Sequence, residues 1–264
     1  MRALSASELL DAWERGLSEP PARRSLALLS AACSPALPDG QASGRAEDPA
    51  PGQIEDPAHD PAMLSIGQRD AWLLSLREAA FGPQLVAVAG CSECGERLEW
   101  TFETADLRIR PDIDPDRGLA IDTDGYHVAF RLPNSLDLAV VANLRDVESA
   151  RLELLRRCIS IAQYAGRQLR SDELPETVVA SVVQRMAEVD PQADLRLNLT
   201  CPVCGHRWGA LFDIESFFWR EISAWAERVI REVHTLASAY GWRESEVLNL
   251  SPSRRQLYLS LVNG

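Results

Sequence analysis

Two cysteine pairs in this sequence have a spacing typical of metal ligation. Cys91 and Cys94 stand in "CSECGERLEWTF", and Cys201 and Cys204 stand in "CPVCGHRWGALF". Two cysteines separated by two residues can direct both sulfurs at one ion. The glycine that follows each pair can adopt the positive φ that such a tight turn needs. The sequence therefore predicts two metal-binding knuckles.

The two knuckles match one another beyond their cysteines. They share Cys, Cys, Gly, Arg and Phe at equal offsets, ending at Phe102 and Phe212. Two such turns that face each other form a Cys₄ tetrahedron, which is the closed geometry of a structural zinc site and has no open position for catalysis. We therefore expect one structural Zn²⁺ per chain. Its predicted ligands are the four knuckle cysteines: Cys91, Cys94, Cys201 and Cys204.

The long separation of the two pairs leaves alternatives open. The pairs of a zinc ribbon are usually about 15–20 residues apart, whereas 106 residues separate Cys94 from Cys201. The site would then be a split zinc ribbon, closed across an inserted helical segment. The alternatives are four core thiols without a metal, or one disulfide. A thioredoxin-like redox pair is disfavoured, because neither knuckle opens a helix within a βαβ pattern.

The other residues that could do chemistry form no catalytic constellation. The sequence has no phosphate-cradling glycine loop, no His-Glu-x-x-His and no Gly-x-Ser-x-Gly. We expect His206 to be a surface or stacking residue, and Cys33 and Cys158 to be small core residues. The acidic stretch 112–125 does not match a calcium-binding loop and is expected to be a solvated loop. We therefore expect a protein that is not an enzyme and has no small-molecule substrate.

Composition narrows the possible partners and compartment. The net charge of −12 disfavours binding to nucleic acid or to an anionic membrane surface. The sequence shows no secretory signal and no apolar run of about 18 residues, so we expect a cytoplasmic protein without a transmembrane helix. Six cysteines in a reducing compartment suggest metal ligands or buried thiols before disulfides.

Hydrophobic periodicity places each knuckle between short strands. The first lies between "QLVAVAG" and "ERLEWTFE", and the second lies between "DLRLNLT" and "HRWGALF". Another strand is expected over 125–133. Helical spacing predicts two short C-terminal helices and seven further helices, over 5–17, 22–33, 64–82, 135–144, 146–162, 175–189 and 213–240. The expected fold class is α+β: mainly helical, with a small antiparallel split zinc-ribbon element and a long helix in the C-terminal half.

Composition also divides the chain into three parts. Residues 1–33 form an N-terminal helical segment. Residues 34–62 hold six prolines, several acidic residues and almost no large apolar ones, so we expect a flexible linker or insertion. Residues 63–264 form a helical core domain that contains the zinc ribbon.

The helix expected over 213–240 carries one continuous apolar stripe. Apolar residues recur every three or four positions from Ile214 to Tyr240. Phe217 and Trp219 fall beside this stripe and widen the apolar face. We predict that Phe217, Trp219 and Trp225 contact a protein partner. The alternative is that all of this face belongs to the core.

Several stretches together resemble a known family. They are "LSIGQRDAWLLSLREAAFG", "CSECGERLEW", "YHVAFRLPNSLDL", "LTCPVCGHRWGALFDIESFFWREI" and "REVHTLASAYGWRESEVLNLSPSRRQLYL". The sequence resembles the contractile-tail phage baseplate proteins known as baseplate hub assembly chaperones, whose relatives occur in phage-like contractile injection systems. The likeness covers nearly the whole chain except 34–62.

The resemblance implies a non-catalytic factor that helps to build the baseplate hub of a contractile tail, with baseplate or hub proteins as its partners. A permanent structural subunit of the particle is the first alternative. A zinc-ribbon adaptor for nucleic acid is the second; the net charge disfavours it, and a cluster of arginines near Arg97 and Arg207 would favour it.

Overall fold

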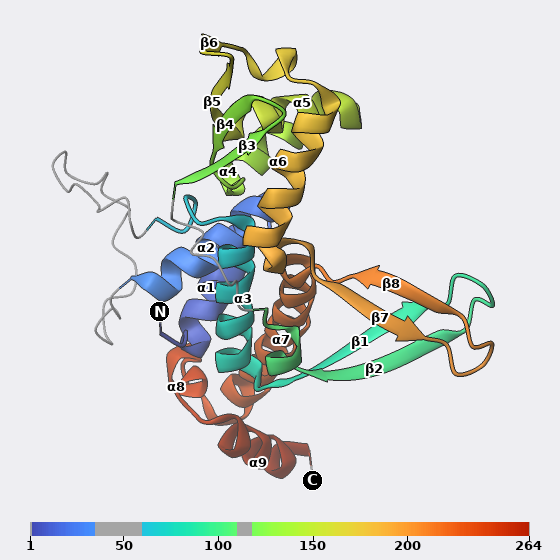
Figure 1. Cartoon of the computed structure of the whole chain (residues 1–264). Helices are drawn as coiled ribbons and strands as arrows, with labels where there is room; N and C mark the ends of the chain where they lie inside the picture. The colour runs from blue at the N-terminus through green and yellow to red at the C-terminus, as the bar shows by residue number, and fades with distance from the viewer. Residues whose placement is uncertain (1, 35–59, 110–117, 264) are drawn as a thin grey trace, which may run out of the picture. The chain divides into compact units, whose positions relative to one another are not determined.

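The computed structural model describes residues 2–34, 60–109 and 118–263. The chain divides into two compact units. Unit 1 consists of Met1–Ala46 and Ile214–Gly264, and unit 2 consists of Glu47–Asp213. Helices and small antiparallel sheets occur together (Figure 1), so the expected mixture of helix and sheet is confirmed. Most of the predicted linker 34–62 lies outside the described residues, and the predicted three-part division stays a prediction.

The described part of unit 1 is helical. Its helices are α1 (Ala6–Gly16), α2 (Pro21–Cys33), α7 (Ile214–Tyr240), α8 (Glu244–Leu248) and α9 (Pro252–Asn263). Ser5 caps α1 through a capping box with Glu8. The long helix α7 confirms the helix expected over 213–240.

Two tryptophans join the N-terminal helices to α7 within unit 1. Trp13 donates a hydrogen bond from Nε1 to Ser223 Oγ at 3.2 Å. Trp219 packs against Gly16 so closely that an added Cβ would lie 2.3 Å from the Trp219 ring. The guanidinium carbon of Arg24 lies 4.9 Å from the centre of the same ring, which is a cation–π contact. Trp219 therefore contributes to the packing of unit 1.

A buried ion pair joins α9 to α7. Arg255 donates from Nε to Glu232 Oε2 at 3.1 Å, and Gln256 donates from Nε2 to Glu232 Oε1 at 2.7 Å. Glu232 and Arg255 are both buried. Because a buried charge is costly unless it is paired, these contacts specify where α9 lies on α7.

Unit 2 contains a four-stranded antiparallel sheet in the order β3-β4-β5-β6. Its strands are β3 (Leu119–Thr123), β4 (Tyr126–Phe130), β5 (Ile159–Tyr164) and β6 (Arg167–Gln168). The helices of this unit are α3 (Ile66–Phe81), α4 (Ser135–Val141), α5 (Val147–Cys158) and α6 (Glu176–Val189). Val178 and Val182 of α6 share a buried core with Val128 of β4 and Ala162 of β5.

A fully buried carboxylate fixes the link between β4, α4 and α5. Asp137 accepts hydrogen bonds from Arg131 Nη2 at 2.9 Å, Arg157 Nε at 2.7 Å and the backbone N–H of Asn134 at 3.0 Å. Burial opposes the ionisation of Asp137, but these donors outweigh burial and lower its pKa to about 2. The ionised form of Asp137 therefore stabilises this region.

Two predictions about this sheet are wrong. The helix expected over 146–162 ends at Cys158, and the remaining residues enter strand β5. The stretch 112–125 was expected to be a solvated loop, but its second half contains β3 and the β3–β4 turn; residues 110–117 lie outside the described part. In both cases pairing with β4 decides the structure, because β4 has β3 on one side and β5 on the other.

Two further two-stranded sheets complete unit 2. Strand β1 (Gln84–Gly90) pairs with β2 (Arg97–Glu103), and β7 (Arg196–Thr200) pairs with β8 (Arg207–Leu211). Figure 1 shows the two hairpins extending side by side with their turns at the same end. Helix α3, which Ser65 caps through a capping box with Gln68, leads into β1. The 3₁₀ turns η2 (Thr104–Leu107), η3 (Ser171–Glu173) and η4 (Pro191–Asp194) connect the other elements.

Candidate metal centre

Each predicted knuckle is the turn of one of these hairpins. The last paired residues before and after the first turn are Gly90 and Arg97. Those of the second turn are Thr200 and Arg207. Along each strand the side chains alternate between an exposed and a half-buried or buried face, as the sequence periodicity predicts. The strands therefore deliver both cysteine pairs to the same end of unit 2.

The two knuckles repeat the same backbone hydrogen bonds. The N–H of Cys91 donates to the carbonyl of Glu96, and the N–H of Cys201 donates to the carbonyl of His206, both at 2.8 Å. The glycine after each pair donates to the carbonyl of the first cysteine at 2.9 Å. Both glycines, Gly95 and Gly205, have a φ of 73°. The predicted need for glycine is confirmed, because L-residues rarely adopt this φ.

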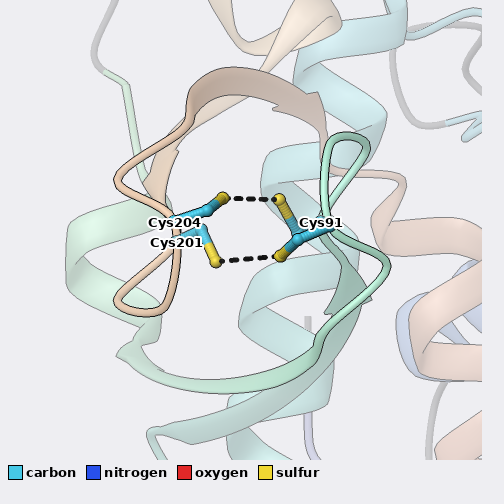
Figure 2. A group of neighbouring side chains, drawn as sticks. Cys91, Cys201 and Cys204 are labelled. Carbon is cyan, nitrogen blue, oxygen red and sulfur yellow. Dashed lines mark hydrogen bonds between the residues drawn. The ribbon is translucent and has the colours of Figure 1, made fainter.

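The four sulfurs of the two knuckles form one cluster. All four lie within 4.8 Å of one another. Two short separations run between the hairpins: Cys91 Sγ lies 3.6 Å from Cys204 Sγ, and Cys94 Sγ lies 3.7 Å from Cys201 Sγ. Figure 2 shows Cys91 facing Cys201 and Cys204 across the gap between the two turns. The structure thus brings together four residues from two stretches that are far apart in the sequence.

These separations fit a tetrahedral thiolate site. Zn–S bonds of about 2.3 Å in a tetrahedron place the sulfurs about 3.8 Å apart, close to the 3.6 and 3.7 Å observed between the hairpins. Cys91 and Cys201 are buried, whereas Cys94 and Cys204 are exposed. A divalent metal ion with a preference for sulfur is therefore compatible with the cluster, and zinc is the ion that commonly takes four cysteines.

The thiols of the cluster differ in acidity. The backbone N–H groups of Cys94 and Glu93 donate toward the Cys91 sulfur and outweigh its burial, so the pKa of Cys91 falls to about 6. The N–H of His206 acts in the same direction on Cys204, but burial and the three neighbouring thiols outweigh it and raise the pKa of Cys204 to about 12. Binding of a metal to these sulfurs would therefore release protons.

An aromatic layer lies next to the cluster. The His206 ring stacks on Trp208, with 5.7 Å between centroids and 14° between planes. Trp208 in turn meets Trp100 of the other hairpin edge-on, at 5.9 Å and 77°. His206 Nε2 also shares a hydrogen bond of 3.1 Å with Ser92 Oγ in the first knuckle. The stacking expected of His206 is confirmed, but its contact with Ser92 and the pairing of the tryptophans were not predicted.

The other two cysteines discussed above, Cys33 and Cys158, and the strand histidine His127 are not members of this cluster. Cys158 is buried as expected, and burial raises its pKa to about 11. The prediction for Cys33 is wrong: it is exposed at the C-terminal end of α2, whereas Leu28, Leu29 and Ala32 before it are buried. His127 Nδ1 lies 2.8 Å from Asp122 Oδ1 on the sheet surface.

The predicted partner-binding residues lie on α7. Trp225 packs against the buried cluster of Leu10, Ala226, Val229 and Leu248, and Trp219 packs against α1 and α2. Phe217 is half-buried. Whether these side chains also contact another protein stays a prediction. Beside them, Ile230 is 44% exposed.

The described chain is thus a protein of helices and small antiparallel sheets with a candidate Cys₄ metal centre on paired hairpins. It belongs to the family described as T4 bacteriophage base plate protein, whose family model matches residues 53–219. The match includes both knuckles and the first part of α7. No curated protein and no solved structure matches the chain significantly. Within the described residues, no helix is both long and apolar enough to cross a membrane.

Proposed function

We propose that Cys91, Cys94, Cys201 and Cys204 hold one structural zinc ion per chain, as the closing element of a split zinc ribbon. The proposal is supported by the separations between their sulfurs and by the matching knuckle backbones. Four protein thiolates fill a tetrahedral ion, so this zinc has no position for water or substrate. Its contribution is to join two hairpins that are each too small to be stable alone.

We further propose that the chain acts without catalysing a reaction. Ser92 and His206 are within hydrogen-bond distance, as a nucleophile and a base would be. However, the His206 ring stacks on Trp208, and the backbone carbonyl of His206 accepts the N–H of Cys201 within the second knuckle. A catalytic pair also needs a group that orients the base and a pocket for substrate. We assign Ser92 and His206 a structural role instead.

We infer that the protein is an assembly factor, or chaperone, for the baseplate hub of a contractile tail in a phage or a phage-like injection system. The family match over residues 53–219 carries this proposal, because it places the chain among baseplate proteins. The resemblance described above adds the role in hub assembly. The partners are baseplate or hub proteins, and the protein acts in the cytoplasm where tails are built.

The experiment is a deletion of the gene in a host that makes the complete tail, with the wild-type gene returned on a plasmid. Electron microscopy should show that intact sheathed particles are lost while tube and sheath proteins are still made, and that the plasmid restores the particles. Normal particles in normal numbers without the gene would overturn the proposal.

A permanent structural subunit of the baseplate is the second candidate. The family description favours it, because it names a base plate protein and no chaperone. The nucleic-acid adaptor has less support. In the sequence of the first hairpin Glu93, Glu96 and Glu99 lie within four residues of Arg97, and these negative charges oppose contact with phosphates.

The contact with a partner is proposed to involve α7. Trp219 is a poor probe of this contact, because its truncation would also remove the packing against Gly16 and Arg24. Ile230 is the better probe, since 44% of it is exposed. Ile230→Glu should lower the yield of particles while the purified protein keeps its melting temperature. Unchanged particle yield would remove this part of α7 from the proposed interface.

A further inference from the structure

We propose that Ser92, His206, Trp208 and Trp100 form a latch that holds the two hairpins together on one side and positions the four cysteines for metal. The proposal rests on the zinc site proposed above. Two contacts of the latch join the two hairpins, and the third connects these two contacts within the second hairpin. Ser92 meets His206 at 3.1 Å, His206 stacks on Trp208 at 5.7 Å, and Trp208 meets Trp100 at 5.9 Å.

The internal symmetry of the site shows that the latch is one-sided. The knuckles are related by an approximate two-fold relation that exchanges Cys91 with Cys201 and Cys94 with Cys204. Under this exchange the contact from Cys91 to Cys204 becomes the contact from Cys201 to Cys94, and the two distances, 3.6 and 3.7 Å, are nearly equal. The metal ligands therefore obey the symmetry.

The latch residues break this symmetry. At the same offsets from the first cysteine, Ser92 corresponds to Pro202 and His206 corresponds to Glu96. The side chain of proline has no hydrogen-bonding atom, so the bond between Ser92 and His206 has no counterpart on the other side. The tryptophans likewise have small or aliphatic counterparts: Trp208 corresponds to Leu98, and Trp100 corresponds to Ala210.

The latch is coupled to the cysteines through short paths. Ser92 is bonded directly to Cys91 along the chain. The carbonyl of His206 accepts the backbone N–H of Cys201 at 2.8 Å, which closes the second knuckle. The hydrogen bond between the Ser92 and His206 side chains therefore fixes one cysteine of each hairpin relative to the other. Groups that orient metal ligands in this way typically change metal affinity about 10–100-fold when they are removed.

The symmetry supplies a matched control for the test. His206→Ala and Ser92→Ala each remove the contact between the knuckles, whereas Glu96→Ala removes an exposed side chain from the equivalent position of the first knuckle. The apparent dissociation constant for Zn²⁺ is measured on the full chain by competition with a chromophoric chelator. The absorption of the Co²⁺-substituted proteins checks that all variants keep four thiolate ligands.

The expected result is an affinity for Zn²⁺ about tenfold or more weaker in His206→Ala and Ser92→Ala, with Glu96→Ala close to the wild type. Equal affinities in all four proteins, or an equal loss in Glu96→Ala, would overturn the latch. A wild-type Co²⁺ spectrum typical of three thiolates and one imidazole, which changes in His206→Ala, would also overturn it, because His206 would then be a ligand.

A metal-free readout separates the latch from the zinc proposal. Trp100 and Trp208 lie close enough to give an exciton band in circular dichroism. In the presence of a strong chelator the wild type and Glu96→Ala should keep more of this band than His206→Ala does. The same band in all three proteins would refute a latch that works without metal, whether or not the wild type binds zinc.

Discussion

Replacing Cys201 by serine should release the metal and loosen both hairpins. Cys201 is fully buried, and its sulfur lies 3.7 Å from that of Cys94 on the other hairpin. A serine side chain is similar in size to cysteine, but its hydroxyl is a poor zinc ligand. The variant therefore has three thiolates and one buried hydroxyl at the site. The zinc content should fall from about one ion per chain toward zero.

The size of the effect follows from how the two hairpins are held together. Two-stranded hairpins are marginal alone, and besides the cysteines the contacts between them include one hydrogen bond and one aromatic pair. Free zinc at about 100 times its dissociation constant contributes about 2.7 kcal/mol to folding stability. For a protein of this size that corresponds to a change in melting temperature of about 5–10 °C.

The assay is elemental analysis combined with thermal unfolding, with and without a chelator. The melting temperature of the wild type should fall by about 5–10 °C when a chelator is added. Cys201→Ser should have the lower melting temperature from the start, and the chelator should not change it. Cys33→Ser is the matched control, because Cys33 is an exposed thiol outside the cluster. A wild-type protein that is folded, metal-free and indifferent to zinc would refute the reasoning, as would a Cys201→Ser variant that retains one ion per chain.

Two further predictions concern unit 2. Asp137 has a pKa of about 2, below its ordinary value of 3.8, so its contribution to stability is present above about pH 4 and is lost as the pH falls toward 2. Asp137→Asn should lower the free energy of unfolding by about 3 kcal/mol at neutral pH. Urea titrations at several pH values should also show that the free energy of unfolding of the variant changes less between about pH 4 and pH 2 than that of the wild type. A variant with the same pH dependence as the wild type would contradict this. Ala165 has a φ of 48° in the β5–β6 turn, so Ala165→Gly should raise the melting temperature by relieving about 1 kcal/mol of strain, and Gly166→Ala should lower it. Equal melting temperatures in both variants would show that the turn is not strained.

The knuckles could be predicted from sequence because their signals are local and doubled. Glycine after each cysteine pair, the alternation through Leu98 and Trp100, and the repeated offsets of the second knuckle are all visible without a structure. Both glycines adopt the expected positive φ. The latch was not predictable in the same way, because the contact between Ser92 and His206 joins residues 114 positions apart. The signal that would have drawn attention to it is the difference between the two knuckles at these positions.

The errors in the fold have different physical origins. Ile159 and Ile161 continue an apolar helical pattern, and only pairing with β4 makes them a strand. For β3 a local signal exists in the sequence, namely the pair Asp124-Gly125, because Asp-Gly favours a two-residue turn between strands in which both residues have positive φ. The observed φ values are 51° and 80°. The apolar residues around Cys33 in the sequence predict a core position. Cys33 is exposed instead, because it lies at the end of a helix, where side chains have fewer neighbours.

The proposed role as an assembly factor can be tested most directly by quantitative mass spectrometry of purified, intact particles. An assembly chaperone leaves its product, so this chain should be absent from finished tails or far below one copy per baseplate, while cell extracts made during assembly contain it bound to hub proteins. Its presence in finished particles at a fixed ratio to the baseplate proteins would contradict the chaperone role and identify a structural subunit.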